Sequence, residues 1–182
     1  GFTAEGRVFR TDIDDARAAR FAAASATLRR DVESKGYELG AGYSWNEGYV
    51  RAKFADIDVT IDGQPADSDI GTYLATPVGQ IITLGGAQSF TNLDLTVGAD
   101  VEIVLDYDDV QAGQRPLDGY EVFNIFAEYR PAQYSNLSFR LDVRNLFDAT
   151  YADRATYGQE FGTVTPLYQP GRSFLISASA KF

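Results

Sequence analysis

The 182-residue sequence contains no cysteine, no histidine and no methionine. It therefore has no thiol nucleophile, no zinc site of the Cys or His type and no Ser-His-Asp machinery of its own. The remaining residues offer no credible acid–base pair and no glycine loop that would cradle a phosphate. These absences exclude the common hydrolase classes, and we expect a chain that is not an enzyme and carries no catalytic residue, metal or cofactor of its own.

Positive charge and long apolar runs are also scarce. Lys and Arg number 16 against 26 Asp and Glu, and the formal net charge of -10 argues against a nucleic-acid partner held by phosphate contacts. No stretch approaches the roughly 20 apolar residues that a membrane-spanning helix needs. If the chain enters a membrane, it does so as β-strands. The sequence begins with Gly1 and shows no secretory signal, so we expect a mature or internal piece of a longer protein.

What the sequence does have is alternation of apolar and polar residues with period two, in segments separated by Gly, Asn, Pro and Asp. The alternating segments are residues 2–10, 37–45, 49–61, 79–90, 95–107, 118–130, 137–144 and 174–182. This pattern predicts an all-β, antiparallel protein. Segment 49–61 changes phase midway, which we interpret as a bulge near Ala55.

The connections between these segments alternate between short and long ones. The short, turn-forming connections are Asn46–Glu47, 91–94 and 133–136, and the long polar ones are 11–32, 63–78, 108–117 and 148–170. In outer-membrane barrels, short turns face the periplasm and long loops face outside. The loop at 11–32 is rich in alanine, with acidic residues early and arginines late, which is compatible with a short helix.

Strands can cross a membrane only as a closed barrel, because every backbone polar group must be paired in hydrocarbon. The apolar faces then meet lipid, and the opposite faces need water or a polar plug. The charged residues expected on the inner faces are Arg7, Glu38, Arg51, Lys53, Asp100, Glu102, Arg140, Asp142, Arg144 and Lys181. The aromatic residues expected to form interfacial girdles are Tyr43, Trp45, Tyr49, Tyr107, Tyr120 and Tyr129. Among the loop tyrosines, Tyr73, Tyr157 and Tyr168 are weak candidates for ligand contact, with loop packing the favoured role.

The end of the chain carries a combination of motifs. Leu-Asp-Val-Arg-Asn-Leu-Phe-Asp occupies residues 141–148, Thr150 and Tyr151 follow, and Pro-Gly-Arg at 170–172 leads into the last segment. This combination resembles the carboxyl end of TonB-dependent outer-membrane receptors, and residues 33–45 are similar to a strand of these receptors with a Gly-aromatic-Glu pattern. The signature positions are Asn145, Leu146, Phe147, Asp148, Pro170, Gly171 and Arg172.

The last segment resembles the insertion signal of outer-membrane barrels, in which an exposed apolar strand is read by the barrel-assembly machinery through edge pairing. The residues expected to carry this assembly signal are Phe174, Ile176, Ala178, Ala180 and Phe182.

The resemblance implies that residues 1–182 are the C-terminal segment of a transmembrane barrel of about 22 strands, filled in the family by an N-terminal plug that this chain lacks. The implied function is energy-coupled uptake of an iron complex, haem or a ferric siderophore, in the bacterial outer membrane. The implied partners are outer-membrane lipid, lipopolysaccharide, the barrel-assembly machinery and TonB, which acts through the missing plug. Residues 55–90 resemble a run found in some haem receptors, which favours the haem branch; the chain has no histidine, so a histidine ligand to haem would have to lie upstream.

Two alternatives stay open from the sequence alone. The first is a self-standing barrel of about eight strands with a structural or adhesive role, whose interior is just wide enough for its own side chains. A compact, heat-resistant monomer of this chain would favour it. The second is a soluble lipocalin-like binding module, whose apolar faces would be buried in a protein core and which would need no detergent.

Overall fold

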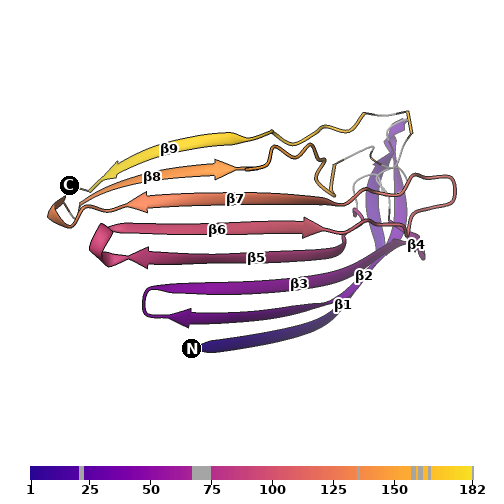
Figure 1. Cartoon of the computed structure of the whole chain (residues 1–182). Coiled ribbons are helices and arrows are strands. Elements are labelled where there is room, and N and C mark those ends of the chain that lie inside the picture. The colour runs from indigo at the N-terminus through magenta and orange to yellow at the C-terminus, as the bar shows by residue number, and fades with distance from the viewer. Residues whose placement is uncertain are drawn as a thin grey trace.

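The structure is a computed structural model that describes residues 1–20, 23–66, 75–134, 136–156, 159, 162–163 and 165–181. They form one antiparallel sheet (Figure 1). The strands are β1 (Phe2–Arg20), β2 (Ala23–Trp45), β3 (Gly48–Ile61), β4 (Gln64–Pro65), β5 (Gly79–Phe90), β6 (Leu95–Val104), β7 (Tyr120–Tyr129), β8 (Leu137–Arg144) and β9 (Ser173–Ala180). Short 3-10 helices at Thr91–Leu93 and Ala132–Tyr134 lie in two of the turns. No helix of the described residues is long and apolar enough to cross a membrane.

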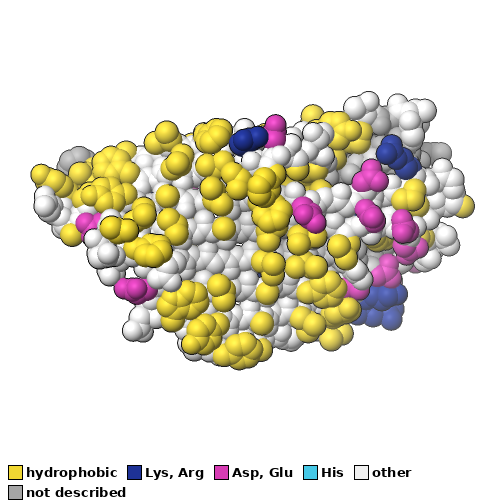
Figure 2. Space-filling view, in the orientation of Figure 1, with side chains coloured by type: hydrophobic (Ala, Val, Ile, Leu, Met, Phe, Trp, Pro, Cys, Tyr) yellow, Lys and Arg dark blue, Asp and Glu magenta, His cyan; other side chains and the backbone are white. Residues whose placement is uncertain are grey.

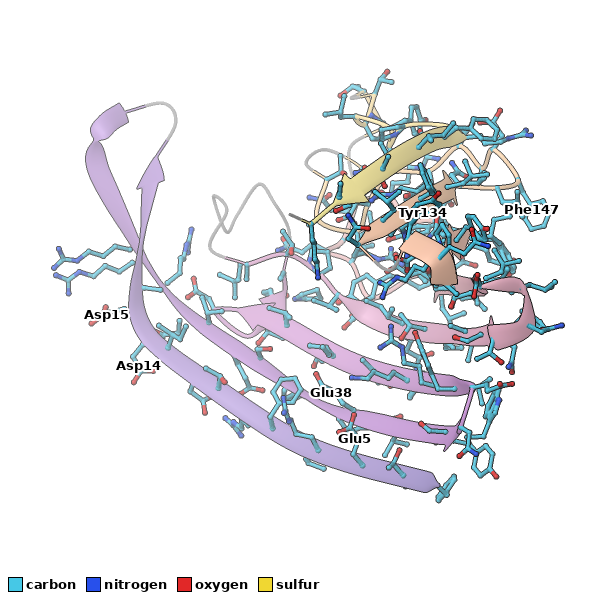
Figure 3. The ribbon with its side chains drawn as sticks, turned by 90° about the vertical axis from the view of Figure 1, so that its left-hand side faces the viewer. Glu5, Asp14, Asp15, Glu38, Tyr134 and Phe147 are labelled. Carbon is cyan, nitrogen blue, oxygen red and sulfur yellow. The ribbon has the colours of Figure 1, made fainter. Side chains whose placement is uncertain are left out.

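The sheet follows chain order, β1-β2-β3-β5-β6-β7-β8-β9, with the short β4 paired to β3. The predicted antiparallel strands are therefore confirmed. The sheet curls into an arc (Figure 3), and among the described residues no pairing joins β1 to β9. The described strands therefore form a section of a curved sheet, which we call the wall. In a self-standing barrel, the first and last strands would pair with each other.

The two faces of the sheet differ sharply in polarity. Residues directly opposed across a ladder share a face, and pairs such as Leu39–Phe54 and Leu141–Ile176 make one face apolar. Many of these side chains lie exposed, with Ile176 80% accessible. Figure 2 shows apolar side chains over most of this face, with charged ones gathered toward the long-loop end. A lipocalin-like module would have covered this surface with protein, so the exposed face argues for contact with lipid.

The prediction of a polar loop with a short helix at 11–32 was wrong for the described residues 11–20 and 23–32. They continue β1 and β2 into a long ribbon that bends at the end of the sheet (Figure 1). Of the opposite charges that suggested a helix, Asp15 and Arg29 lie 3.6 Å apart across the hairpin instead. The ladder shifts register once near Asp15, whose φ is 55°.

The bulge predicted near Ala55 is also absent from the described ladders. β3 pairs without a break with β2 and with β5. The change of phase is real but has another cause, because the two faces exchange polarity along a regular strand. Beyond Asp56, Ile57, Val59 and Ile61 pack on the inner face against loop residues that include Ala66 and Val78. The outer face turns polar at the same level, which marks the edge of the apolar band.

Candidate functional site

The inner face of β1, β2 and β3 is lined by charged side chains in pairs. Arg7 lies 3.5 Å from Glu38, and Lys53 lies 3.5 Å from Glu5. Figure 3 labels Glu5 and Glu38 on neighbouring strands. Gly40 makes room for this arrangement, since a Cβ there would lie 2.7 Å from Cγ of Glu5. Because these pairs are exposed, each stabilises the fold by at most about 1 kcal/mol. Their main effect is to make the inner face hydrophilic.

A polar cavity of about 480 Å³ lies further along the wall, between β6, β7 and the β8–β9 loop. Its two carboxylates are held by neutral donors. Asn124 Nδ2 donates to Asp100 at 2.7 Å, and the Tyr120 hydroxyl donates to Glu102 at 3.1 Å. Arg144 also lines this cavity, and within the described part of the chain no carboxylate forms an ion pair with it. The cavity therefore offers charges of both signs to a polar ligand.

Asn145 is the centre of the signature and is only 3% exposed. Its side chain accepts from the amide of Ala149 at 2.8 Å and donates to the carbonyls of Ala149 at 2.8 Å and Pro170 at 3.3 Å. Its own amide donates to Oδ1 of Asn124 at 2.9 Å. The residue takes a left-handed conformation, with φ at 50°, which asparagine tolerates better than most residues. Asn145 thus ties the end of β8 to the cavity wall and to the segment before β9.

The other signature residues complete the same connection. The Asp148 carboxylate accepts the amide of Arg172 at 2.7 Å, and a Cβ at Gly171 would lie 2.6 Å from that carboxylate. The amide of Leu146 donates to the carbonyl of Phe123 at 2.8 Å, and Phe147 packs edge-on against the Phe123 ring at 5.1 Å. The structure brings the seven predicted positions together as a brace for the β8–β9 loop.

The loop tyrosines have different placements. Tyr168 is about half exposed and lines a cavity of about 200 Å³ together with Tyr120 and Tyr151. Tyr73 and Tyr157 lie outside the described residues. Tyr151, which sequence reasoning did not single out as a ligand contact, packs against Tyr120 with the rings tilted and their centres 4.5 Å apart, and it borders both cavities. The sequence feature that could have pointed to Tyr151 was its position just after the signature residues 145–148.

The girdle prediction is partly wrong. Tyr43, Trp45 and Tyr129 are exposed on the apolar face near the short turns, as expected. Three others turn elsewhere: Tyr49 lies on the inner face beside Arg51, Tyr107 is buried among the loops, and Tyr120 binds Glu102. Alternation along β3 and β7 places Tyr49 and Tyr120 on the inner face, whereas Tyr107 lies beyond the end of β6 in the β6–β7 loop. Proximity to a strand end did not reveal either placement.

The four described residues of the assembly-signal segment alternate along one face of β9, where each is paired to an apolar residue of β8. They are Phe174, Ile176, Ala178 and Ala180, and all are exposed. Phe182 lies outside the described residues. β9 has a strand partner on one side only among those residues, which is the geometry that edge pairing needs. The assembly role itself stays a prediction.

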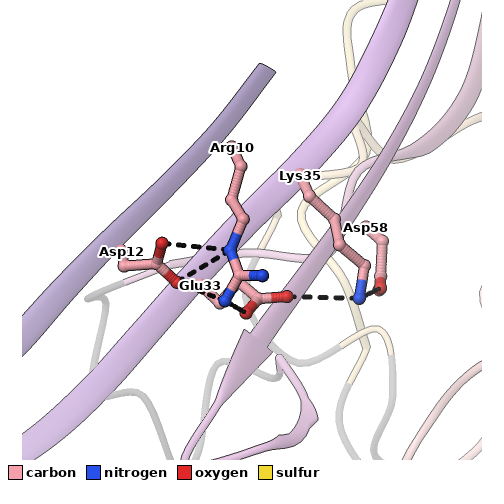
Figure 4. A network of polar contacts seen from close by, with 5 residues as sticks. All are labelled: Arg10, Asp12, Glu33, Lys35 and Asp58. Carbon is pink, nitrogen blue, oxygen red and sulfur yellow. Dashed lines mark hydrogen bonds and ion pairs between the residues drawn. The ribbon is translucent and has the colours of Figure 1, made fainter. Parts of the chain in front are cut away.

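A charged network closes the apolar band on the outer face at the long-loop end (Figure 4). Arg10 contacts Asp12 at 3.0 Å and Glu33 at 2.6 Å, and Lys35 contacts Glu33 and Asp58, each at 3.2 Å. In register, these residues come directly after the opposed pair of Val8 and Tyr37. The outer face therefore changes from apolar to charged within one step of the ladder, as at the boundary between hydrocarbon and headgroups.

A curved antiparallel sheet with an apolar outer face, a charged inner face, short turns at one end and long loops at the other defines a section of an outer-membrane β-barrel. Residues 1–146 match the family model described as TonB dependent receptor-like, beta-barrel. The chain belongs to this family, whose members are non-enzymatic receptors of the bacterial outer membrane. The predicted recognition, fold class and location are thereby confirmed.

The chain is similar to the haem transporter BhuA of Brucella suis biovar 1 (strain 1330), with 29% identity over 157 residues, 84% of this chain and 23% of that protein. Among solved structures it resembles the FrpB iron transporter from Neisseria meningitidis (F3-3 variant), with a TM-score of 0.78 and 24% identity, over 100% of this chain and 28% of that one. The copper transporter OprC matches with a TM-score of 0.74 and 19% identity, over 100% and 29%. The structural matches show the fold alone. The chain spans 23% of the length of its curated relative.

Proposed function

We propose that these strands are the C-terminal part of a larger, plugged barrel that imports an iron complex, with haem as the first candidate, using energy delivered by TonB through the plug. The observation that carries the proposal is the charged inner face on an open, curved sheet. Such a face needs water or a polar plug opposite it, and a section of a large barrel supplies both. The similarity to the haem transporter BhuA supports haem as the ligand.

The inner wall would contribute polar contacts more than iron ligands. A tyrosine binds iron as the phenolate, and burial raises the pKa of Tyr151, which disfavours that form. Tyr151 is better suited to stacking and hydrogen bonding at the cavity. Tyr168 is more exposed. We therefore do not assign Tyr151 as an axial haem ligand.

Copper is a less suitable cargo for these strands. OprC, which shares the fold, is a copper transporter, but soft and imidazole ligands suit copper best, and this chain has no Cys, His or Met. The oxygen donors at the cavity favour a polar organic ligand over a bare soft metal ion.

The test is growth on haemin. The receptor containing these strands would be produced in a Gram-negative host that cannot make haem and lacks its own haem receptor. We expect growth on haemin that disappears when TonB is deleted. A matched assay with ferric siderophores in an iron-starved host separates the two ligand classes. Growth on siderophores but not haemin would move the assignment to the siderophore branch, and growth on neither would refute iron-complex uptake.

A further inference from the structure

Arg154, in the loop between β8 and β9, is only 7% exposed. Arginine is almost never so deeply buried without a partner. Its Nη1 donates to the carbonyl of Leu117 at 3.2 Å, and its Nη2 donates to the carbonyl of Leu105. Its guanidinium carbon lies 5.7 Å from the centre of the Tyr107 ring. Neutral groups thus take the place of a carboxylate, and burial lowers the pKa of Arg154.

The two carbonyls lie at the two ends of the β6–β7 loop. Tyr107 and Leu117 pair there through both backbone hydrogen bonds, at 2.9 and 3.0 Å. The Asp106 carboxylate accepts the amide of Gly119 at 2.7 Å and closes the same neck. A guanidinium that binds both carbonyls therefore grips the loop where it leaves and re-enters the sheet.

The β6–β7 loop is also joined to the β3–β5 connection. Gln111 donates to the carbonyl of Pro65 at 3.1 Å. Tyr107 packs over Gly79, where a Cβ would lie 2.7 Å from the ring, and burial raises the pKa of Tyr107 to about 12. Arg154 is thus the point at which the β8–β9 loop enters a layer that links the described parts of three connections.

Arg154 follows three residues after Tyr151, which borders the two polar cavities. Between them, Ala152 is buried. The segment is therefore held at one end by the packing of Tyr151 against Tyr120 and at the other by Arg154. We propose that Arg154 is a positioning residue of the two polar cavities, which together we call the ligand vestibule. Arg154 binds both ends of the β6–β7 loop and so holds Tyr151 at the cavity wall. The ligand part of this inference rests on the proposed uptake function.

Residue 154 could be required for either of two reasons, and they can be distinguished. One is a guanidinium that binds two carbonyls at once, and the other is a buried positive charge of any shape. The guanidinium presents several donors in a rigid planar fork, whereas lysine places its donors at a single point. Arg154→Lys keeps the charge but cannot reproduce the double contact. If geometry matters, the lysine variant behaves like Arg154→Gln.

The experiment compares the intact receptor with its R154Q, R154K and R130Q variants. Arg130, in the short connection between β7 and β8, is the control, because its side chain is 71% exposed, it pairs with Glu128 at 2.8 Å, and it lines neither cavity. Heat-modifiable gel mobility verifies that each barrel is folded. Hydrogen exchange is then measured at the amides of Tyr107 and Leu117, followed by titration of uptake with haemin.

Both Arg154 variants should speed exchange at these two amides about tenfold, the effect expected for loss of hydrogen bonds to a charged group. They should also raise the haemin concentration for half-maximal uptake about three- to tenfold, with the maximum unchanged. R130Q should match the wild type. Wild-type exchange in R154Q, or full rescue by R154K, would overturn the grip. Faster amide exchange with an unchanged haemin concentration for half-maximal uptake would overturn the vestibule role. A wild-type receptor indifferent to haemin would refute the haem assignment, and the exchange data would still decide the grip.

Discussion

The two ends of the sheet are held together in different ways. At the short-turn end, neighbouring turns join through surface contacts, since Thr91 donates to Glu47 at 3.1 Å and the amide of Ala132 donates to Asp94 at 2.8 Å. At the long-loop end, buried side chains such as Asn145 and Arg154 bind backbone groups of segments distant in sequence. The difference is one of burial, because exposed contacts join the turns at one end and buried polar groups join the loops at the other.

This contrast assigns separate roles to the two ends. Exposed contacts between short turns cost little to rearrange and set only the edge of the wall. Buried polar groups at the long-loop end are costly to leave unpaired, so they fix the shape of the loops that border the polar cavities. We expect ligand specificity to reside at the long-loop end, and stability to be far more sensitive to single substitutions there.

The largest effect should come from an asparagine substitution at the long-loop end, which is compared with one at the short-turn end. Asn145→Ala removes three side-chain hydrogen bonds from a buried site and should lower the free energy of unfolding by about 2–3 kcal/mol. Asn136→Ala, at the short-turn end, removes an exposed bond to the carbonyl of Lys181 at 3.2 Å and should cost about 0.5 kcal/mol or less. Urea unfolding of the receptor in lipid vesicles measures both. Equal costs would remove the distinction between the ends.

A second, smaller effect should come from glycine substitutions within the β8–β9 connection itself. Gly171→Ala places a Cβ 2.6 Å from the Asp148 carboxylate, which must then shift away from the amide of Arg172. We expect a loss of about 1–2 kcal/mol, in the range for overpacking. Gly162→Ala is the control, because a Cβ there meets nothing within 4 Å. The same unfolding assay applies, and a neutral Gly171→Ala would show that the brace tolerates rearrangement.

The sequence predicted the regular strands of the sheet and its short-turn end. Period-two alternation is set by strand geometry, so it identified the strands and the lipid-facing side chains such as Leu141 and Ile176. The turn at Asn46–Glu47 follows from residues adjacent in the chain. The signature also showed that residues 145–148 and 170–172 belong together, although only the structure shows Asn145 making the connection.

What the sequence did not reveal depends on partners far along the chain. The described ribbon at 11–20 and 23–32 lacks clear alternation, and the sequence did not reveal which residues face each other across it, such as Asp15 and Arg29. The polarity exchange in β3 has the same pattern as a bulge until Ala66 and Val78 are seen covering the inner face. Arg154 stands in no local motif, and its burial becomes visible only once the β6–β7 loop is placed beside it.

The smallest effect tests whether exposed contacts at the long-loop end matter at all. The pKa of Asp62 is lowered, chiefly because its carboxylate accepts the amide of Asp31 at 2.9 Å, and also because Arg30 donates to it at 2.6 Å. A carboxyl whose pKa is lower in the folded state stabilises the fold above its unfolded pKa of about 4, and this stabilisation is lost as the pH falls through the folded value.

Asp62→Asn removes that dependence. The urea midpoints of the wild type and the variant should therefore differ at pH 7 and converge as the pH falls from about 5 to 3. Because Asp62 is exposed, the gap should be smaller than the effect of Gly171→Ala. A gap that persists unchanged at pH 3 would show that the Asp62 contacts act through hydrogen-bond geometry and not through charge.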